Sequence, residues 1–200
     1  MASARFSVEV LLAFDDDDIE TAEYLKTDPI PNSRVVVGPR VGYGGLHLYV
    51  NALARIATGD WLFLWNDDCI METQGWDSVV GEYDGQMVVL NPQSNHSNQE
   101  RGQCVFPIVP RRMVEILGHF SLSNHNDTYV EHIANRLGIR RDVPIHVLHD
   151  RADLTGNNDD DVFRERVFTT SEFFGPEIQR LIVEDCEKLR PHLDASWSRQ

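Results

Sequence analysis

Short apolar runs alternate with segments of helical periodicity along the chain. Runs rich in β-branched and aromatic residues predict strands, and they cover residues 6–14, 34–38, 61–65, 86–91, 104–110 and 143–149. Apolar residues spaced three and four apart predict helices, and such segments cover residues 19–26, 46–57, 76–83, 111–120, 127–137 and 176–189. Strands that are apolar on both faces and alternate with helices indicate an α/β fold with a mainly parallel central sheet and helices on both of its faces. The run at 34–38 accordingly predicts a short buried strand.

The helix expected at 127–137 has signals at both ends. Asn126 or Asp127 is a suitable N-cap, and Gly138 is a suitable C-cap. Its predicted buried face consists of Val130, Ile133, Ala134 and Leu137.

Polar clusters follow three of the predicted strands. They are Asp15 to Asp18, Asn66 to Asp68, and His149 with Asp150. Ligands of open α/β sheets bind outside the carboxyl ends of the strands, so we expect these clusters to lie at the binding edge.

The stretch GDWLFLWNDDCIM, residues 59–71, runs from a buried strand directly into two carboxylates. Oxygen ligands suit Mg²⁺ or Mn²⁺, which also accept substrate phosphate oxygens. Asp67 and Asp68 could therefore hold a divalent cation that bridges the protein and a diphosphate. The alternative is a turn in which Asn66 and Asp67 cap the next helix.

Composition narrows the class of protein. The chain has 200 residues, of which 42% are hydrophobic and 25% charged, as expected for one globular domain. Its net charge of −14 argues against a general binder of nucleic acid or anionic membranes. The sequence has neither signal-peptide features nor an apolar run long enough to span a membrane, so we expect a soluble cytoplasmic protein. Cys69, Cys104 and Cys186 lack metal-binding or disulfide spacing and are expected to be reduced thiols.

The order of the motifs resembles the GT-A glycosyltransferases, especially the family-2-like group. A glycine-bearing loop, a helix with an Asn-Ala pair, an Ala-x-Gly-Asp turn and an apolar strand lead there into the DXD metal motif. The resemblance covers roughly residues 6–150. The matching residues here are Gly42, Gly44, Asn51, Ala57, Gly59, Asp60 and Asn66-Asp67-Asp68.

This resemblance implies a GT-A, Rossmann-like domain and a role for each matching residue. Asp68 and His149 would hold Mn²⁺ or Mg²⁺, with His146 as the alternative histidine, and Asp127 would be the general base. The family pattern departs at Asn66, where an aspartate is usual, and in the acidic first loop. That loop is implied to hold the nucleotide base and ribose, or else is a solvated loop that caps a helix. The residues implied on the donor side are Ala13, Phe14, Asp15, Asp16, Tyr43, Gly44, Asn51, Asn66 and Asp67.

The predicted function is therefore transfer of a sugar from a nucleotide-diphosphate sugar to a hydroxyl acceptor, with inversion. Residues 1–90 would bind donor and metal, residues 91–150 the acceptor, and residues 151–200 would form an acidic loop and a helix. Glycans and small molecules are candidate acceptors. Hydroxymethylated DNA bases, which bacteriophage enzymes of this type glycosylate, are a further candidate because arginines gather in the acceptor half. These arginines are Arg101, Arg111, Arg112, Arg136, Arg140 and Arg141.

Two alternatives remain. A nucleotidyltransferase would share an acidic metal site on a nucleotide-binding sheet, although the first loop here is acidic and not glycine-rich and basic. A non-catalytic module that binds nucleotide sugars would account for Asn66.

Overall fold

A computed structural model describes residues 2, 3, 5–96, 103–156 and 175–193, and the structural statements below concern these residues. The acidic segment expected at residues 157–161 lies outside them. The strands are β1 (Val10–Asp15), β2 (Ser33–Gly38), β3 (Trp61–Phe63), β4 (Cys69–Met71), β5 (Val89–Ser94), β6 (Ile108–Pro110) and β7 (Arg140–His149). The α-helices are α1 (Ile19–Thr27), α2 (Leu46–Ile56), α3 (Trp76–Gly81), α5 (Arg111–Leu117), α6 (Asn126–Leu137), α7 (Ala152–Thr155) and α9 (Pro176–Leu189). Short 3₁₀ turns are η1 (Tyr43–Gly45) and η2 (Arg190–His192).

The described strands form two sheets. Five of them are hydrogen-bonded in the order β3-β6-β5-β7-β4, while β1 and β2 form a separate parallel pair. Parallel pairing covers six residue pairs in β1–β2 and five in β5–β7. Antiparallel pairing covers three residue pairs in β3–β6, three in β4–β7 and one in β5–β6. Counted over both sheets, parallel residue pairs outnumber antiparallel ones; within the five-stranded sheet, β5–β7 is the parallel pair and the other three strand pairs are antiparallel.

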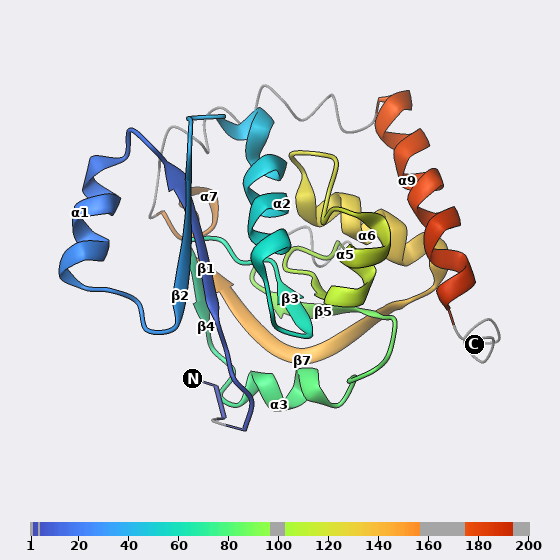
Figure 1. The fold of residues 1–200 in the computed structure, drawn as a ribbon. Helices are drawn as coiled ribbons and strands as arrows, with labels where there is room; N and C mark the ends of the chain where they lie inside the picture. Colours follow the sequence, from blue (N-terminus) through green and yellow to red (C-terminus); the bar gives the residue numbers. More distant parts are fainter. Residues whose placement is uncertain (1, 4, 97–102, 157–174, 194–200) are drawn as a thin grey trace.

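Helices cover both faces of the five-stranded sheet, as Figure 1 shows. Side chains that alternate along a strand point to opposite faces. Val89 and Val109 therefore pack with α5, α6 and α9 on one face, whereas Leu90 and Ile108 pack with α3 on the other. This arrangement confirms the predicted α/β class and is that of a Rossmann-like domain.

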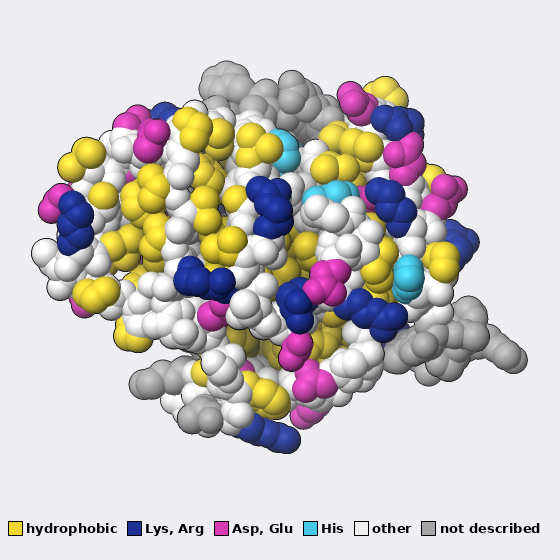
Figure 2. Space-filling model, viewed as in Figure 1, with side chains coloured by type: hydrophobic (Ala, Val, Ile, Leu, Met, Phe, Trp, Pro, Cys, Tyr) yellow, Lys and Arg dark blue, Asp and Glu magenta, His cyan; other side chains and the backbone are white. Residues whose placement is uncertain are grey.

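The prediction that residues 34–38 form a buried strand is wrong. Val35 and Val37 of β2 are 43% and 53% exposed. β2 pairs only with β1 among the described strands, and none of its residues is buried. Figure 2 shows hydrophobic side chains at the surface over this part of the molecule.

One local prediction is also wrong, and one short strand was not predicted. Helix α6 begins at Asn126 and its N-cap is His125, so neither Asn126 nor Asp127 is the cap. Instead, Asp127 lies in the first turn of α6. The short strand β4, which directly follows Asp68, has no counterpart among the predicted elements.

None of the helices in the described part of the chain combines the length and the apolar character that a bilayer span needs.

Candidate functional site

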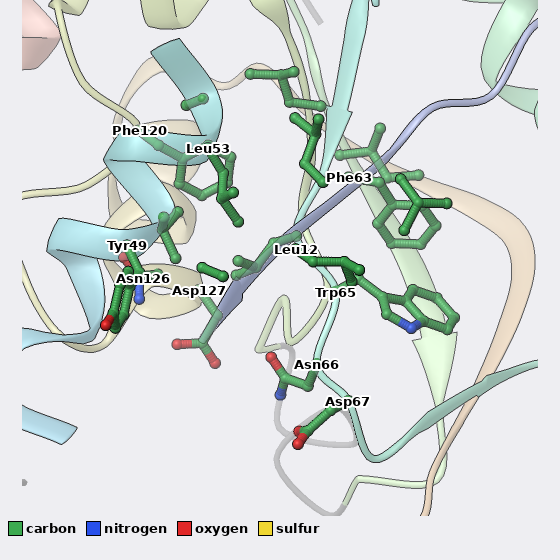
Figure 3. A pocket seen from close by; sticks show the side chains of 18 of the residues that line it. Leu12, Tyr49, Leu53, Phe63, Trp65, Asn66, Asp67, Phe120, Asn126 and Asp127 are labelled. Carbon is green, nitrogen blue, oxygen red and sulfur yellow. The ribbon is translucent and has the colours of Figure 1, made fainter. Parts of the chain in front are cut away.

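A large cleft lies beside the ends of β3 and β7 and encloses about 1800 Å³. Its wall includes residues from β1, α2, the loop after β3, the start of α6 and the end of β7. Figure 3 shows Asn66, Asp67 and Asp127 together in one part of the cleft, with Leu12, Leu53, Phe63 and Phe120 in another. The cleft thus has an acidic region and an apolar region.

Asp68 and His149 meet at the edge of this cleft. Cys69 and His149 are register partners in the antiparallel β4–β7 pair, which places Asp68 beside the end of β7. The carboxylate Oδ1 of Asp68 is 3.1 Å from Nε2 of His149. The backbone N–H of Asp150 donates to the carbonyl oxygen of Asp68 at 2.7 Å, which fixes the two chain segments to each other.

The environment keeps Asp68 ionised. Burial by itself raises the pKa of the carboxyl group, but the neighbouring His149 outweighs it and holds the pKa of Asp68 below its usual value. The imidazole of His149 is 2% exposed. Phe106 contacts its ring edge-on at 5.1 Å between centroids and so restricts its orientation.

Cys69 joins this pair. One potential ligand atom from each of Asp68, Cys69 and His149 lies within 4.8 Å of the others. Neither ring nitrogen of His149 makes a regular hydrogen bond among the described residues. A carboxylate oxygen, an imidazole nitrogen and a thiol sulfur are all ligands for divalent transition metals, so the donor set fits such an ion.

His149 lines the cleft, whereas His146 does not. The backbone N–H of His146 donates to Thr73 Oγ1 at 2.7 Å, and its carbonyl oxygen accepts from the N–H of Glu72 at 3.0 Å. His146 is exposed, and it does not belong to the group of potential ligands around Asp68.

Asn66 and Asp67 lie in the loop between β3 and β4. Both line the cleft and both are exposed. Trp65, which precedes them, is 40% exposed and contacts Phe63 edge-on. The strand that carries these residues is anchored by Leu62 and Leu64, which pack on the core beneath α5 and α6.

Asp127 approaches the cleft from the opposite wall. It lies in the first turn of α6, where the helix dipole favours a carboxylate. The hydroxyl of Thr128 donates to Asp127 Oδ1 at 3.3 Å and accepts from Gln103 Nε2 at 2.9 Å. The structure therefore brings Asp67, Asp68, Asp127 and His149 to one cleft.

The acidic first loop is largely engaged by neighbouring side chains. Arg40 forms ion pairs with Asp15 at 3.2 Å and with Asp17 at 2.9 Å. Asp18 accepts a hydrogen bond from the N–H of Thr21 at 3.0 Å and so caps α1. Of the predicted donor-side residues here, Ala13, Phe14 and Asp15 line the cleft, while Asp16 does not.

Tyr49 supports the end of β1. Its hydroxyl donates to Asp15 Oδ1 at 2.8 Å and lies 2.9 Å from the carbonyl oxygen of Gly38. Burial, together with the Asp15 carboxylate, raises the pKa of Tyr49 to about 12. The phenol therefore remains protonated and keeps Asp15 in a fixed position at the cleft.

The glycine-bearing loop contributes Tyr43 to the cleft but not Gly44. Tyr43 Oη is 3.4 Å from His125 Nδ1, which links this loop to the start of α6. A Cβ at Gly44 would meet nothing within 4 Å, whereas one at Gly45 would lie 2.5 Å from Val41 Cβ. The loop thus requires glycine at Gly45, and also at Gly42, where φ is +60°.

Asn51 does not line this cleft. Its amide is 8% exposed and holds the segment before α6. Oδ1 accepts from the N–H groups of Phe120 at 2.7 Å and Ser121 at 3.1 Å, and Nδ2 donates to the carbonyl oxygen of Ser121 at 2.7 Å. The contacts of Asn51 are therefore with the backbone that leads to Asp127.

Sequence reasoning missed three residues at the site. The sequence predicted an ordinary reduced thiol at Cys69 and assigned no role to Arg151. For His96 it indicated no more than that a ring in a loop can stack on a base or a sugar. His96 and Arg151 both line the cleft next to His149. Their positions could have identified them, because His96 follows β5 and Arg151 follows β7, and polar residues after strand ends form the rest of the site.

Comparisons with known proteins bear on the fold. No protein-family profile and no curated protein sequence matches the chain. Among solved structures, the chain is similar to the mannosyltransferase PcManGT from Pyrobaculum calidifontis, determined in complex with GDP-Man and Mn²⁺. The TM-score is 0.53 at 11% sequence identity, over 95% of this chain and 68% of the other. The chain thus has a glycosyltransferase fold, similar to that of this mannosyltransferase.

Proposed function

We propose that the protein is a metal-dependent, inverting glycosyltransferase that transfers a sugar from a nucleotide-diphosphate sugar to a hydroxyl acceptor. One observation carries the proposal: the Asp68–His149 pair and Asp127 line the same cleft of a glycosyltransferase fold. The similar mannosyltransferase was solved with GDP-Man and Mn²⁺, which supports the same class of donor and ion here.

Asp68 and His149 would hold the divalent ion, with the sulfur of Cys69 as a third nearby donor. When bound, such an ion neutralises the negative charge that develops on the departing diphosphate. Because the pKa of Asp68 is held below its usual value, its carboxylate is available as a ligand throughout the neutral range. Asp67, exposed on the same loop, would contact the ribose or a water ligand of the ion.

Asp127 would act on the acceptor. Its carboxylate would accept the proton of the acceptor hydroxyl while the hydroxyl oxygen attacks the anomeric carbon from the side opposite the diphosphate. The bond between that carbon and the phosphate oxygen breaks, and its electron pair leaves with the nucleoside diphosphate. Inversion of configuration at the anomeric carbon follows from this single displacement.

The donor's base and ribose would lie along β1. Ala13, Phe14 and Asp15 line this end of the cleft, and Tyr43 faces it from the loop before α2. Asp15 is fixed by Tyr49 and Arg40, which makes it the better candidate for a ribose hydroxyl than Asp16. Asn51 would act indirectly, by positioning the segment that carries Asp127.

The test is a donor screen. The protein is incubated with Mn²⁺ and single nucleotide sugars, and mass spectrometry follows release of free sugar and nucleoside diphosphate. We expect hydrolysis of one donor class, and we expect it to be lost in Asp68→Asn and in wild type treated with EDTA.

Other products would point elsewhere. Pyrophosphate released from a nucleoside triphosphate and a sugar phosphate would indicate a nucleotidyltransferase. A donor that binds without any turnover, with or without candidate acceptors, would indicate a non-catalytic module. Either result contradicts the proposal.

A further inference from the structure

A cationic group, Arg151, lines the same cleft as the candidate metal pair. Nη2 of Arg151 is 3.0 Å from Nε2 of His96. Both side chains are almost fully buried, with 9% of Arg151 and 6% of His96 exposed. Because a guanidinium stays protonated and only donates hydrogen bonds, His96 Nε2 is the acceptor. The proton of the His96 ring is therefore on Nδ1.

This contact continues to the metal pair. The rings of His96 and His149 stack with 5.9 Å between centroids and 30° between planes. His149 in turn lies 3.1 Å from Asp68. His96 follows β5 and Arg151 follows β7, and these neighbouring parallel strands end at the same edge of the sheet. Arg151, His96, His149 and Asp68 thus form one row of contacts along the cleft wall, and all four line it.

The row matters because it brings a guanidinium, which stays protonated, to the wall of the cleft. The cleft is otherwise rich in carboxylates, including Asp67, Asp68 and Asp127. The Asp68 carboxylate offsets part of the positive charge of a bound divalent ion. The remaining charge does not balance a diphosphate, because each of its phosphate groups is negatively charged. A second cation in the same cleft would compensate the remainder, and the planar guanidinium suits two phosphate oxygens at once.

We propose that Arg151, held by His96, forms the subsite for the donor phosphate that is bonded to the sugar. This inference rests on the proposed function and names a residue of the same site. When the sugar leaves, the electron pair of the broken bond goes to an oxygen of that phosphate, and Arg151 lies where it would compensate the added charge. His96 is a positioning residue, since it would act only through Arg151.

The experiment compares nucleoside mono- and diphosphates of the same base. Calorimetry with Mn²⁺ gives both dissociation constants for wild type, Arg151→Gln, Arg151→Lys and His96→Phe. A charge-assisted phosphate contact is lost in Arg151→Gln, so diphosphate binding weakens by about one to two orders of magnitude. Monophosphate binding stays within about twofold, because the missing group is the one that Arg151 contacts.

The other variants distinguish loss of the phosphate contact from a general effect on folding. Arg151→Lys keeps the charge but loses the paired geometry, so it loses only part of the preference for diphosphate. His96→Phe keeps the ring stack and removes the acceptor, with a smaller loss in the same direction. Arg180→Gln removes one positive charge from exposed α9, outside the cleft, and leaves both constants unchanged.

Three results would overturn the inference. Equal weakening of mono- and diphosphate in Arg151→Gln would show a general structural role. Unchanged diphosphate binding in Arg151→Gln and Arg151→Lys would show that the phosphate lies elsewhere. If wild type binds no nucleotide of either kind, the proposed function itself fails, and the inference fails with it.

Discussion

Asp68 and His149, which are far apart in the sequence, face each other with Oδ1 and Nε2 3.1 Å apart. The antiparallel pairing of β4 with β7 and the hydrogen bond from Asp150 N–H to the Asp68 carbonyl oxygen fix this relationship. The geometry is held by backbone on both sides, so a change in either side chain should remove ion binding without unfolding the edge.

We predict that Mn²⁺ raises the melting temperature of the wild type, since a ligand of the native state stabilises it by mass action. Asp68→Asn and His149→Gln should lose this increase. Glu72→Gln is the matched control, because Glu72 is an exposed acid directly after β4 that does not line the cleft. The metal assignment is wrong if Asp68→Asn keeps the Mn²⁺-dependent shift or if Glu72→Gln loses it.

Asp127→Asn should lower kcat about 10²- to 10⁴-fold, the usual contribution of general-base catalysis. The dissociation constant of the nucleoside diphosphate should stay within about twofold, because the proposed role of Asp127 concerns the acceptor and not the donor. Steady-state kinetics and calorimetry on the same preparation measure both quantities.

The control for Asp127 must also remove a carboxylate from the first turn of a helix. Glu177→Gln does so in α9 and should keep full activity, with a loss of only about 0.3–1 kcal/mol in the free energy of unfolding. Similar losses of kcat in Asp127→Asn and Glu177→Gln would show that Asp127 only stabilises its helix.

Asn51→Ala should reduce the free energy of unfolding by about 1–3 kcal/mol, because it leaves the buried N–H groups of Phe120 and Ser121 without their acceptor. We also expect a lower kcat, since this segment leads to Asp127. Arg55→Ala changes an exposed position of the same helix and should stay within about 0.5 kcal/mol of wild type. Urea unfolding measures both, and equal stability of the two variants would contradict the prediction.

Glu9 makes stability depend on pH. Burial raises the pKa of its carboxyl group, but hydrogen bonds from the N–H groups of Thr58 and Gly59 and from Arg34 outweigh this and lower it to about 2. A lowered folded-state pKa stabilises the protein above the unfolded value of 4.5 and ceases to do so as the pH falls toward 2. Glu9→Gln should therefore be less stable than wild type at pH 7.

The difference between wild type and Glu9→Gln should shrink steadily as the pH falls below about 4.5. Urea unfolding at several pH values gives this difference directly. Glu23→Gln serves as a control, because Glu23 is exposed on α1 and pairs only with Lys26 among the described residues. A difference that is constant from pH 7 to pH 3 would show that the hydrogen bonds to Glu9 do not stabilise the fold.

Much of the fold follows from local patterns. The spacing of apolar residues in α6 and α9 fixes which side is buried, and Ile133 and Ile182 are fully buried there. The polar residues after β3 and β7 could be assigned to one edge, because parallel strands end at a common edge of a sheet. Asp68 and His149 were placed at this edge in this way, whereas Asp127 was assigned through the resemblance to GT-A glycosyltransferases, and all three line one cleft.

Contacts between segments that are distant in the sequence could not be predicted from local patterns. β4 has only three residues, and it is defined by its pairing with β7 and not by its own sequence. Nothing local to Asn51 shows that its amide holds the backbone at Phe120. Likewise, Arg151 and His96 are ordinary loop residues in the sequence, and only the pairing of β5 with β7 brings them together.

The exposure of the valines in β2 also could not be predicted from the local sequence. Val35 and Val37 have the pattern of a buried strand, yet both are exposed, and β2 pairs only with β1 among the described strands. A strand pattern specifies pairing and side-chain alternation, whereas burial depends on what covers each face.

The separation of β1–β2 from the five-stranded sheet has a consequence for how this molecule can diversify. The described strands of the two sheets share no backbone ladder, and Asp15 is held by Tyr49 and Arg40 within its own neighbourhood. Asp68, His96, His149 and Arg151 are held by the ends of β4, β5 and β7 instead. If the protein has the proposed function, mutations that change which nucleobase is accepted can accumulate on the β1–β2 pair while the residues around the sugar and diphosphate, held by the other sheet, are left undisturbed.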